Sequence, residues 1–184
     1  MSKKLDSDFK FSRYGIDARL VQVDDAEFIL GLRTNEKLSR YIHATSNDIE
    51  QQKSWMRSYK EREAKGEDYY FIYSFNGCDF AVNRIYDINT DRGTGGSWLC
   101  QQGTEVEHSM ATLLIMRDIL FEVLDLDYDV FDVRKNNKIV QKTHLLLGAK
   151  KIGETELDYL YSLSKEDYQN KKQNIIQLLN LPTN

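Results

Sequence analysis

The sequence predicts an α/β fold in which helices accompany a mixed sheet. Three aromatic and β-branched runs, 69–75, 80–88 and 96–100, are separated by turn residues and indicate an antiparallel meander. After them, segments with helical period alternate with strand-like segments, which is typical of mixed α/β sheets. Because 184 residues are enough for one domain with its own core, we expect a single domain over residues 1–184.

The first part of the chain is expected to carry one strand and two helices before the meander. Residues 1–14 are polar and charged with scattered aromatic residues, so we expect a loosely held arm. A strand begins at Ile16, and the Asp24–Asp25 pair can cap a first helix. Asp48 is expected to begin a second helix with one apolar stripe, and Gly66 to end it.

The second part of the chain is expected to alternate helices with strands. Apolar residues from Met110 to Leu124 recur with helical period. Ser164 begins a Ser-Lys-Glu-Asp capping sequence for the last helix. The expected elements are a helix over 110–124, a strand over 128–133, a helix over 137–147, strands over 151–154 and 159–163, and a helix from 164 to about 179.

Composition argues against several classes of protein. A net charge of −4 argues against a general nucleic-acid binder, and no apolar run approaches the roughly 20 residues that a membrane span needs. The two N-terminal lysines precede no apolar block, so we expect no secretory signal and a cytoplasmic protein. Cys78 and Cys100 accompany no C-x-x-C motif or His cluster, so neither a disulfide framework nor a metal site is expected.

The stretch from Asp132 to Gly153 places polar groups where packing alone would not favour them. If Asn137 opens a helix, Gln141 and His144 follow at i+4 and i+7 and share one stripe with it. Gly148 can end that helix, because glycine adopts the left-handed conformation common just past a helix end. The pattern therefore predicts a short helix that presents hydrogen-bonding side chains to one site.

This spacing resembles the last coenzyme-binding helix of the GNAT superfamily of acyl-CoA N-acyltransferases. Upstream, Gly96–Cys100, a turn and Ser109–Thr112 resemble that family's strand, pyrophosphate loop and helix. The resemblance covers about residues 15 to 168, and it depends on the order of short motifs. It implies a mostly antiparallel sheet with helices on both faces, splayed open between its fourth and fifth strands, which are the runs 96–100 and 128–133.

The resemblance implies acetyl-CoA as acyl-donor cosubstrate. The Leu99 and Cys100 backbones would hold the pantetheine arm, and Asn137, Gln141 and Lys142 would contact the coenzyme. Asn137 alternatively only caps its own helix. The pyrophosphate would bind at the entry of the helix after residue 104, through residues Glu107, His108, Ser109, Met110, Ala111 and Thr112.

This helix entry departs from the family's usual signature. Ser109 stands where the family has a glycine, and Glu107 brings negative charge close to the expected anion. His108 can offset that charge. The alternative is an ordinary helix entry that binds no ligand.

His144 lies where the family more often has a tyrosine that protonates the departing coenzyme A thiolate. Histidine suits this role because its unperturbed pKa of about 6.5 is close to physiological pH. The alternatives are simple hydrogen bonding to the sulfur, or packing without a catalytic role.

The amine acceptor is expected on the opposite side of the sheet. Arg84 and Tyr86 share one face of their strand, and Trp98 can supply a stacking wall. Arg33 lies in the early helix and loop region, where the family commonly gates its acceptor pocket. Core packing of Tyr86 and Trp98, and plain surface exposure of Arg33, are the alternatives. No single carboxylate stands out as the base; Asp87 or a water chain can serve.

The combined pattern of Trp55, Arg84-x-Tyr86, Trp98 and His144 resembles the GNAT enzymes associated with bacterial surface-polysaccharide sugars. It implies N-acetyl transfer by direct attack, with a nucleotide-linked amino sugar as acceptor. The alternatives are a ribosomal-protein-type N-terminal acetyltransferase and a catalytically silent acyl-CoA-binding module. We expect a monomer or homodimer with no nucleic-acid or membrane partner.

Overall fold

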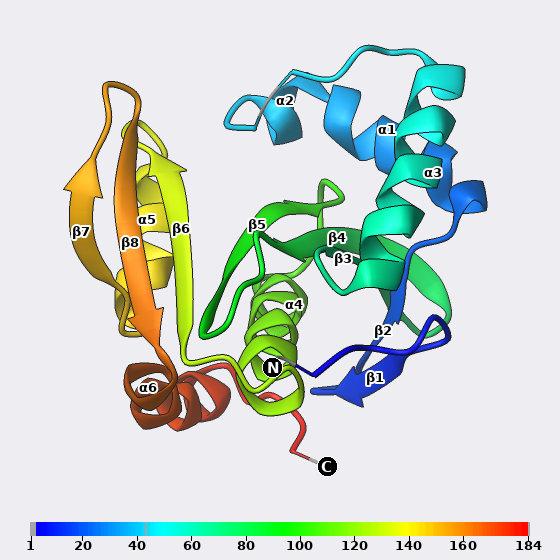
Figure 1. The fold of residues 1–184 in the computed structure, drawn as a ribbon. Helices are drawn as coiled ribbons and strands as arrows, with labels where there is room; N and C mark the ends of the chain where they lie inside the picture. Colours follow the sequence, from blue (N-terminus) through cyan, green and yellow to red (C-terminus); the bar gives the residue numbers. More distant parts are fainter. Residues whose placement is uncertain (1–2, 43, 184) are drawn as a thin grey trace.

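An eight-stranded sheet runs through the part of the chain that this computed structural model describes, residues 3–42 and 44–183 (Figure 1). Its strand order is β1-β2-β3-β4-β5-β6-β8-β7. Every neighbouring pair is antiparallel except β5 and β6, which run parallel. The strands are β1 (Lys10–Arg13), β2 (Ile16–Leu20), β3 (Tyr69–Phe75), β4 (Cys78–Tyr86), β5 (Arg92–Cys100), β6 (Tyr128–Arg134), β7 (Lys150–Glu154) and β8 (Asp158–Ser164).

Helices lie on both faces of this sheet, as expected from the sequence (Figure 1). A short 3₁₀ turn precedes the first helix, and the fourth helix continues into a π-helical turn. These elements are η1 (Val23–Asp25), α1 (Ala26–Thr34), α2 (Glu36–Ser39), α3 (Ile49–Lys65), α4 (Val106–Asp118), η2 (Ile119–Val123), α5 (Lys138–Leu146) and α6 (Lys165–Leu178).

Strand β3 shows how the sheet separates two hydrophobic cores. Tyr69, Phe71 and Tyr73 point to the face covered by α4, whereas Tyr70 and Ile72 point to the face covered by α1 and α3. All five side chains are buried, and successive side chains of a strand alternate between faces. A continuous aromatic run in the sequence therefore corresponds to a central strand that is buried on both sides.

Several helix ends follow the chemistry expected from the sequence, whereas the expected Asp24–Asp25 cap of the first helix does not form. Asp25 precedes α1, but its carboxylate makes no cap bond to that helix, because it accepts from the Gln22 amide and from Arg19. The Asp48 carboxylate caps α3 by accepting from the amides of Glu50 at 2.9 Å and Gln51 at 3.1 Å. Gly66 ends that helix with a φ of 80°. The Ser164 hydroxyl caps α6. These local signals positioned the predicted helices correctly.

The N-terminal segment differs from the loosely held arm expected for residues 1–14. Strand β1 pairs along its length with β2, from Lys10 opposite Arg19 to Arg13 opposite Ile16. Further upstream, the buried Leu5 donates its amide to the Tyr69 hydroxyl at 3.0 Å. The described part of the arm is therefore an edge strand with buried anchors, because its scattered apolar residues find places in the core.

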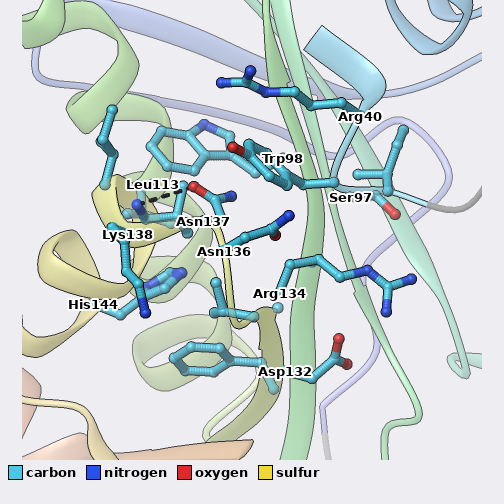
Figure 2. A pocket seen from close by; sticks show the side chains of 18 of the residues that line it. Arg40, Ser97, Trp98, Leu113, Asp132, Arg134, Asn136, Asn137, Lys138 and His144 are labelled. Atoms are coloured by element: carbon cyan, nitrogen blue, oxygen red, sulfur yellow. Dashed lines mark hydrogen bonds between the residues drawn. The ribbon is translucent and has the colours of Figure 1, made fainter. Parts of the chain in front are cut away.

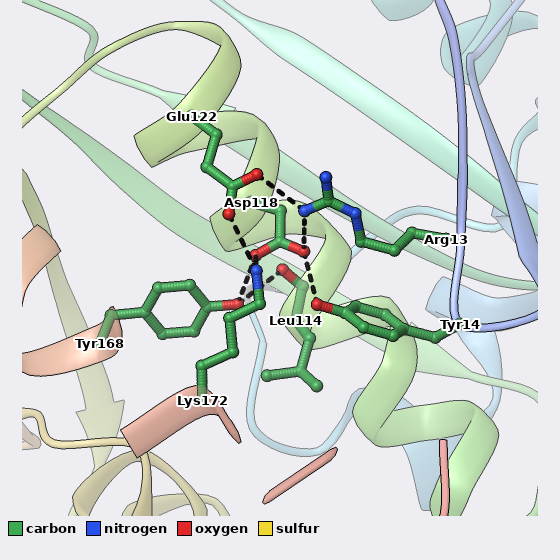
Figure 3. A network of polar contacts seen from close by, with 7 residues as sticks. All are labelled: Arg13, Tyr14, Leu114, Asp118, Glu122, Tyr168 and Lys172. Carbon is green, nitrogen blue, oxygen red and sulfur yellow. Dashed lines mark hydrogen bonds and ion pairs between the residues drawn. The ribbon is translucent and has the colours of Figure 1, made fainter. Parts of the chain in front are cut away.

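A buried carboxylate ties three separate elements together (Figure 3). Asp118, at the end of α4, has a fully buried side chain. It accepts hydrogen bonds from Arg13 and Tyr14 near β1 and from Tyr168 and Lys172 of α6, at 2.7 to 2.8 Å. These bonds attach the N-terminal segment and the last helix to the same turn of α4.

The sheet opens between β5 and β6. Within these two fully described strands, the only paired residues are Arg92 opposite Tyr128 and Gly93 opposite Asp129, after which the strands part. The predicted splay between the runs 96–100 and 128–133 is confirmed. It carries the labels β5 and β6 because β1 adds a strand that the sequence pattern did not predict. We call the opening between β5 and β6 the seam.

Across the described residues, no helix combines the length and apolar character that crossing a membrane requires.

Candidate active site

A cavity of about 440 Å³ occupies the seam (Figure 2). Its walls come from β5, β6, the middle of α4, the start of α5 and the connection after α2. We call it the seam cavity, and it is lined by Leu38, Arg40–Ile42, Gly95–Trp98, Leu113, Met116, Phe131–Arg134, Asn136–Val140 and His144. Its position between two diverging strands leaves room for an extended ligand to lie beside β5.

The fork where β5 and β6 part is closed by a side chain. Asp129 is fully buried, and its Oδ1 accepts a hydrogen bond from the Gly95 amide at 2.8 Å. Its Oδ2 accepts from Arg117 Nε at 3.1 Å. Burial raises the pKa of Asp129, while Arg117 and the Gly95 amide favour the ionised carboxylate. The fork is therefore held by a charged group that satisfies the amide of Gly95.

A β-bulge turns β5 at the edge of the seam cavity. Arg84 lies opposite Gly96 and Val82 opposite Leu99, so two residues of β5 face one residue of β4. The first of the two, Ser97, has a φ of 52° in the left-handed region. A bulge bends its strand and increases the local twist. This bend carries Trp98 to the wall of the seam cavity.

His144 lies on α5 at the inner wall of the seam cavity. Its side chain is buried, packs against the Phe131 ring at 4.4 Å between ring centroids, and places Nδ1 2.9 Å from Arg117 Nη2. Burial, and then the nearby Arg117 charge, lower the pKa of His144 well below its usual 6.5. The site therefore favours a neutral imidazole at neutral pH.

The other predicted residues of α5 occupy different environments. The Asn137 side chain accepts from the Val140 amide at 3.4 Å and also lines the seam cavity. Gln141 is buried, and its Nε2 donates to the backbone oxygens of Arg134 at 2.8 Å and Lys135 at 3.0 Å. Lys142 is exposed and lies outside the lining of the seam cavity. The structure thus brings Asn137 and His144 to the cavity, and uses Gln141 to fix the turn before the helix.

The predicted pyrophosphate segment forms the first turns of α4, away from the lining of the seam cavity. Met110, Ala111 and Thr112 are buried in the core, and His108 packs against the Phe75 ring at 4.2 Å. The first backbone bond of the helix runs from Ser109 N to Glu105 O at 3.0 Å. By helix geometry, the amides of residues 106–108, which include Glu107, have no partner within the helix. These backbone amides can serve an anion at this helix end.

The three consecutive residues Trp98, Leu99 and Cys100 of β5 lie in different environments. Leu99 is buried in the core under α1 and α3, and Cys100 packs against the core on the other face. Burial raises the pKa of the Cys100 thiol. Trp98 lines the seam cavity and donates from Nε1 to Thr112 Oγ1 at 3.0 Å. The cavity therefore meets β5 at residues 95–98, slightly before the pair predicted from the sequence.

Two further cavities extend the seam cavity toward α3. The second has a volume of about 280 Å³ and shares Tyr41, Ile42, residues 95–97, Asp132 and Arg134 with the seam cavity. The third, of about 380 Å³, shares Arg33 and Arg84 with the second and reaches Trp55. We call the second and third cavities together the acceptor cavities. They form a path that meets the seam cavity from the side of the early helices.

Of the predicted acceptor residues, Arg33, Arg84 and Tyr86 line this path, whereas Trp98 lies in the wall of the seam cavity and in neither acceptor cavity. Arg84 makes an ion pair with the buried Asp68, with Nη2 to Oδ2 at 2.5 Å, and its guanidinium lies over the Trp55 ring at 5.1 Å. Arg33 donates from Nε to Thr45 Oγ1 at 2.8 Å. These contacts hold planar, donor-rich guanidinium groups at the cavity wall.

Tyr86 lies where the acceptor path approaches the bulge of β5. Burial, and then the charge of Asp132, raise the pKa of Tyr86 to about 12, so it keeps its proton at neutral pH. A Cβ atom added at Gly96 would lie 3.0 Å from the Tyr86 hydroxyl. The glycine therefore leaves the space in which this phenol approaches β5.

Sequence reasoning missed Asp132 as a site residue, although it opens the stretch that was singled out. Asp132 lies in the wall shared by the seam cavity and the second cavity, and it is the only carboxylate among the described residues of that wall. The sequence feature that could have identified Asp132 is strand alternation, because it places Asp132 and Arg134 on the same face of β6. The alternative base, Asp87, is exposed and lies outside all three cavities.

Arg117 was also missed, although the sequence carries a signal for it. It falls on the apolar stripe of α4, three residues after Leu114 and three before Leu120, so helix geometry turns it toward the core, where a cation needs a partner.

Among the described residues, no group of three or more His, Cys, Asp or Glu side chains is arranged to hold a metal ion.

Comparisons with known proteins place this geometry in a family. No protein-family model matches the chain, and a comparison with curated proteins finds no match. Among solved structures, apo FdhC, described as a nucleotide-linked sugar GNAT, is 33% identical with a TM-score of 0.83, and the alignment covers 94% of this chain and 99% of that one. This chain belongs to the GNAT superfamily.

Other GNAT structures share the fold at lower identity. The ribosomal-protein-S5-alanine acetyltransferase from Vibrio fischeri is 17% identical with a TM-score of 0.74, over 88% of this chain and 99% of that one. The spermidine N-acetyltransferase from Vibrio cholerae, solved with CoA and spermine, is 13% identical with a TM-score of 0.71, over 85% and 99%. At these identities the likeness shows the GNAT fold alone. The resemblance to the GNAT superfamily seen in the sequence is confirmed by the 33% identity to apo FdhC.

Proposed function

We propose that this protein transfers an acetyl group from acetyl-CoA to the primary amine of a nucleotide-linked amino sugar. As a GNAT enzyme it is an acyl-CoA N-acetyltransferase with acetyl-CoA as its cosubstrate. The observation that carries the acceptor class is the 33% identity, over 94% of the chain, to a nucleotide-linked sugar GNAT. The geometry of the acceptor cavities supports the same class.

In this proposal the acyl-pantetheine arm lies in the seam cavity beside β5. The residues 95–98 and the start of α5 face each other across that space. Arg40 and Lys138 add positive charge to its wall, which suits a coenzyme that carries phosphates. Asn137 lines the same cavity at the start of α5 and would contact the amide groups of the arm.

The acceptor would enter through the acceptor cavities from the side of α3. Arg33 and Arg84 face this path, and so does the partly exposed Trp55, whose ring also packs against Tyr59 and the Arg84 guanidinium. Guanidinium groups bind phosphate oxygens, often in pairs, and aromatic rings stack on nucleobases. The same guanidinium groups disfavour a polycation such as spermidine, because like charges repel.

The chemistry requires a neutral amine at the thioester carbon. We assign Asp132 to hold the substrate ammonium and accept its proton, directly or through water, because it lies where the two cavities meet. The amine nitrogen forms a bond to the acetyl carbon, and the C–S bond breaks with its electron pair on sulfur. Counted from the ammonium, two protons leave the nitrogen, one before the attack and one as the C–N bond forms. The products are the amide, the coenzyme A thiolate and two protons, and no acyl-enzyme intermediate forms. Holding both substrates in line supplies most of the acceleration.

A panel of amines tests the acceptor class by release of free coenzyme A thiol. It contains nucleotide-linked amino sugars, the same amino sugars without nucleotide, a peptide with the N-terminus of a ribosomal protein, and spermidine. We expect turnover with a nucleotide-linked sugar and at least about tenfold lower kcat/KM with the free sugar. Preference for the peptide or for spermidine would refute this acceptor.

Two substitutions had left a catalytically silent acyl-CoA-binding module open from the sequence: Ser109 replaces a loop glycine and His144 replaces a tyrosine. Calorimetry with acetyl-CoA separates it from an enzyme. Binding without turnover on any amine of the panel would favour the silent module. Absence of binding would contradict both.

A further inference from the structure

Arg117 is a fully buried cation wedged between an acid and the candidate catalytic histidine. It lies on α4 with 0% exposure of its side chain. Its Nε donates to Asp129 Oδ2 at 3.1 Å, and its Nη2 lies 2.9 Å from His144 Nδ1. Asp129 comes from β6 and His144 from α5, so three elements meet at this guanidinium. The third nitrogen, Nη1, is buried with no hydrogen bond among the described residues.

The chemistry of the guanidinium decides where the proton of the imidazole lies. Arginine carries only donors and does not lose its proton in proteins. A 2.9 Å contact between Arg117 Nη2 and His144 Nδ1 is therefore a hydrogen bond only if Nδ1 is an unprotonated acceptor. In the neutral ring the hydrogen must then lie on Nε2. In a protonated ring, the Nδ1–H group would face an N–H group of Arg117, and this contact could not be a hydrogen bond.

We propose that Arg117, anchored by Asp129, is a positioning residue that fixes His144 as the neutral tautomer with hydrogen on Nε2. In this form His144 serves the departing sulfur as a hydrogen-bond donor and keeps its own proton through the cycle. The role of His144 toward the sulfur rests on the proposed acetyltransferase function, whereas the tautomer of His144 does not depend on that function. Of the three roles left open by the sequence, proton donor, hydrogen-bond donor to the sulfur, or packing alone, this geometry favours the second.

The charged groups around His144 agree with a neutral ring. Arg117 faces it from α4, and Asp129 of β6 is separated from it by the guanidinium. Asp132 of β6 and Lys138 of α5 share the seam cavity with it. Among the described residues, no carboxylate makes an ion pair with His144 that would stabilise an imidazolium. Loss of the Nε2 proton would create an imidazolate, so a neutral ring stabilises the thiolate by hydrogen bonding.

The hydrogen-bonding role of His144 does not change which bonds form and break in the acetyl transfer. The C–N bond forms and the C–S bond breaks, the electron pair stays on sulfur, and the two protons that the ammonium loses leave in turn through Asp132 or water. The thiolate accepts the Nε2–H hydrogen bond of His144 until coenzyme A departs and takes a proton from water. Stabilising the charge that develops on the leaving atom is the contribution of a fixed donor.

Imidazole ¹⁵N NMR of the protein without ligands tests the tautomer directly. The chain has three histidines, so His144→Gln identifies the signals of His144 by their loss. We expect an unprotonated Nδ1 and a protonated Nε2, unchanged from about pH 8 to about pH 5.5. A protonated Nδ1, or titration of the ring with an ordinary midpoint, would overturn the proposal. This measurement needs no acceptor, so its outcome is separate from that of the proposed function.

The matched variant removes both buried charges together, as Arg117→Met with Asp129→Asn. Removing only one partner would leave an unpaired buried charge, whereas an uncharged pair is tolerated better. The amide introduced by Asp129→Asn retains an oxygen that can accept from the Gly95 amide. We expect both tautomers of His144 to appear and its titration to move toward the usual range. A tautomer that stays single and unprotonated at Nδ1 in this variant would show that Arg117 does not set it.

Kinetics with an accepted amine give a second readout. We expect kcat of the double variant to fall by up to about 100-fold, with the KM for acetyl-CoA nearly unchanged. Its pH profile should gain a limb that the wild-type profile lacks, because the histidine now titrates. A uniform loss with an unchanged profile would mean that the pair acts only on the fold, and would count against the positioning role.

Discussion

Asp129 accepts a hydrogen bond from the Gly95 amide at 2.8 Å, two residues beyond Gly93, the last residue of β5 that pairs with β6. The carboxylate thus satisfies an amide at the point where the partner strand turns away. A buried amide without an acceptor would cost about 1 to 3 kcal/mol. The same carboxylate binds Arg117, which contacts His144. The fork of the sheet and the environment of the histidine therefore depend on one side chain.

Gly95→Ala tests how tightly this fork is packed. A Cβ at residue 95 would lie 2.5 Å from Met116 Cε and 3.2 Å from Asp129 Oδ1. Because Met116 is buried and lines the seam cavity, we expect a loss of about 1 to 3 kcal/mol in the free energy of unfolding and weaker acetyl-CoA binding. Urea denaturation and calorimetry measure these effects.

The control for that variant is Gly31→Ala, on the exposed side of α1 with no atom within 4 Å of the added Cβ. Alanine is the better helix former, so we expect this variant to be up to about 1 kcal/mol more stable. If Gly95→Ala matched the wild type in stability and in acetyl-CoA binding, the packing at the fork would be looser than described.

The pKa of His144 predicts a pH dependence of stability. The folded state holds the pKa well below 6.5, so below pH 6.5 the unfolded chain binds a proton that the folded chain does not. The free energy of unfolding should therefore fall as pH decreases below 6.5, by up to about 1.4 kcal/mol per pH unit from this group. His144→Gln keeps an acceptor for Arg117 but cannot titrate. The difference in unfolding free energy between wild type and variant should shrink with decreasing pH, and a pH-independent difference would contradict the assignment.

Asp132→Asn tests the residue where the cavities meet. An amide cannot accept the proton of the amine, so we expect kcat/KM for the acceptor to fall by about 100-fold or more. The dissociation constant of acetyl-CoA should change little. The matched control is Asp87→Asn, since Asp87 is exposed outside the cavities and Asn tolerates its left-handed backbone with a φ of 51°. Equal activities of the two variants would exclude Asp132 as the base.

Arg33→Gln tests the acceptor path. Arg33 lines both acceptor cavities, so loss of its charge should raise the KM for a nucleotide-linked sugar by about tenfold. The KM for acetyl-CoA and the activity on the same sugar without nucleotide should stay near wild-type values. Arg57→Gln, on the exposed side of α3, is the control. An equal loss on both sugars would indicate a structural effect and not recognition of the nucleotide.

Asp118→Asn tests the network that attaches the chain ends (Figure 3). The substitution removes a buried charge that pairs with Arg13 and Lys172, so we expect a loss of about 3 kcal/mol or more in unfolding free energy. Glu122→Gln touches the same two cations from a more exposed position and should cost about 1 kcal/mol or less. Similar losses in the two variants would show that burial does not set the strength of this network.

Most elements were predictable because their signals are local. The caps Asp48 and Ser164, the glycine ends at Gly66 and Gly148, and the aromatic runs of the meander each fix backbone geometry within a few residues. Strand β1 escaped prediction because its four residues alternate exposed and half-buried and gain their partners only from β2. The bulge at Ser97 escaped too, since a register shift is a property of two strands.

The order of motifs in the sequence determined the family, the open seam and the positions of Asn137 and His144 on one helix. Only the tertiary structure decided which side chains meet there. It placed Asp132 where the seam cavity meets the second cavity. It hydrogen-bonded Gln141 to backbone oxygens and brought the buried Arg117 into contact with His144. Helix patterns report neighbours three or four residues apart and strand patterns report neighbours two residues apart, whereas Arg117 and His144 are 27 residues apart and meet only in the folded chain.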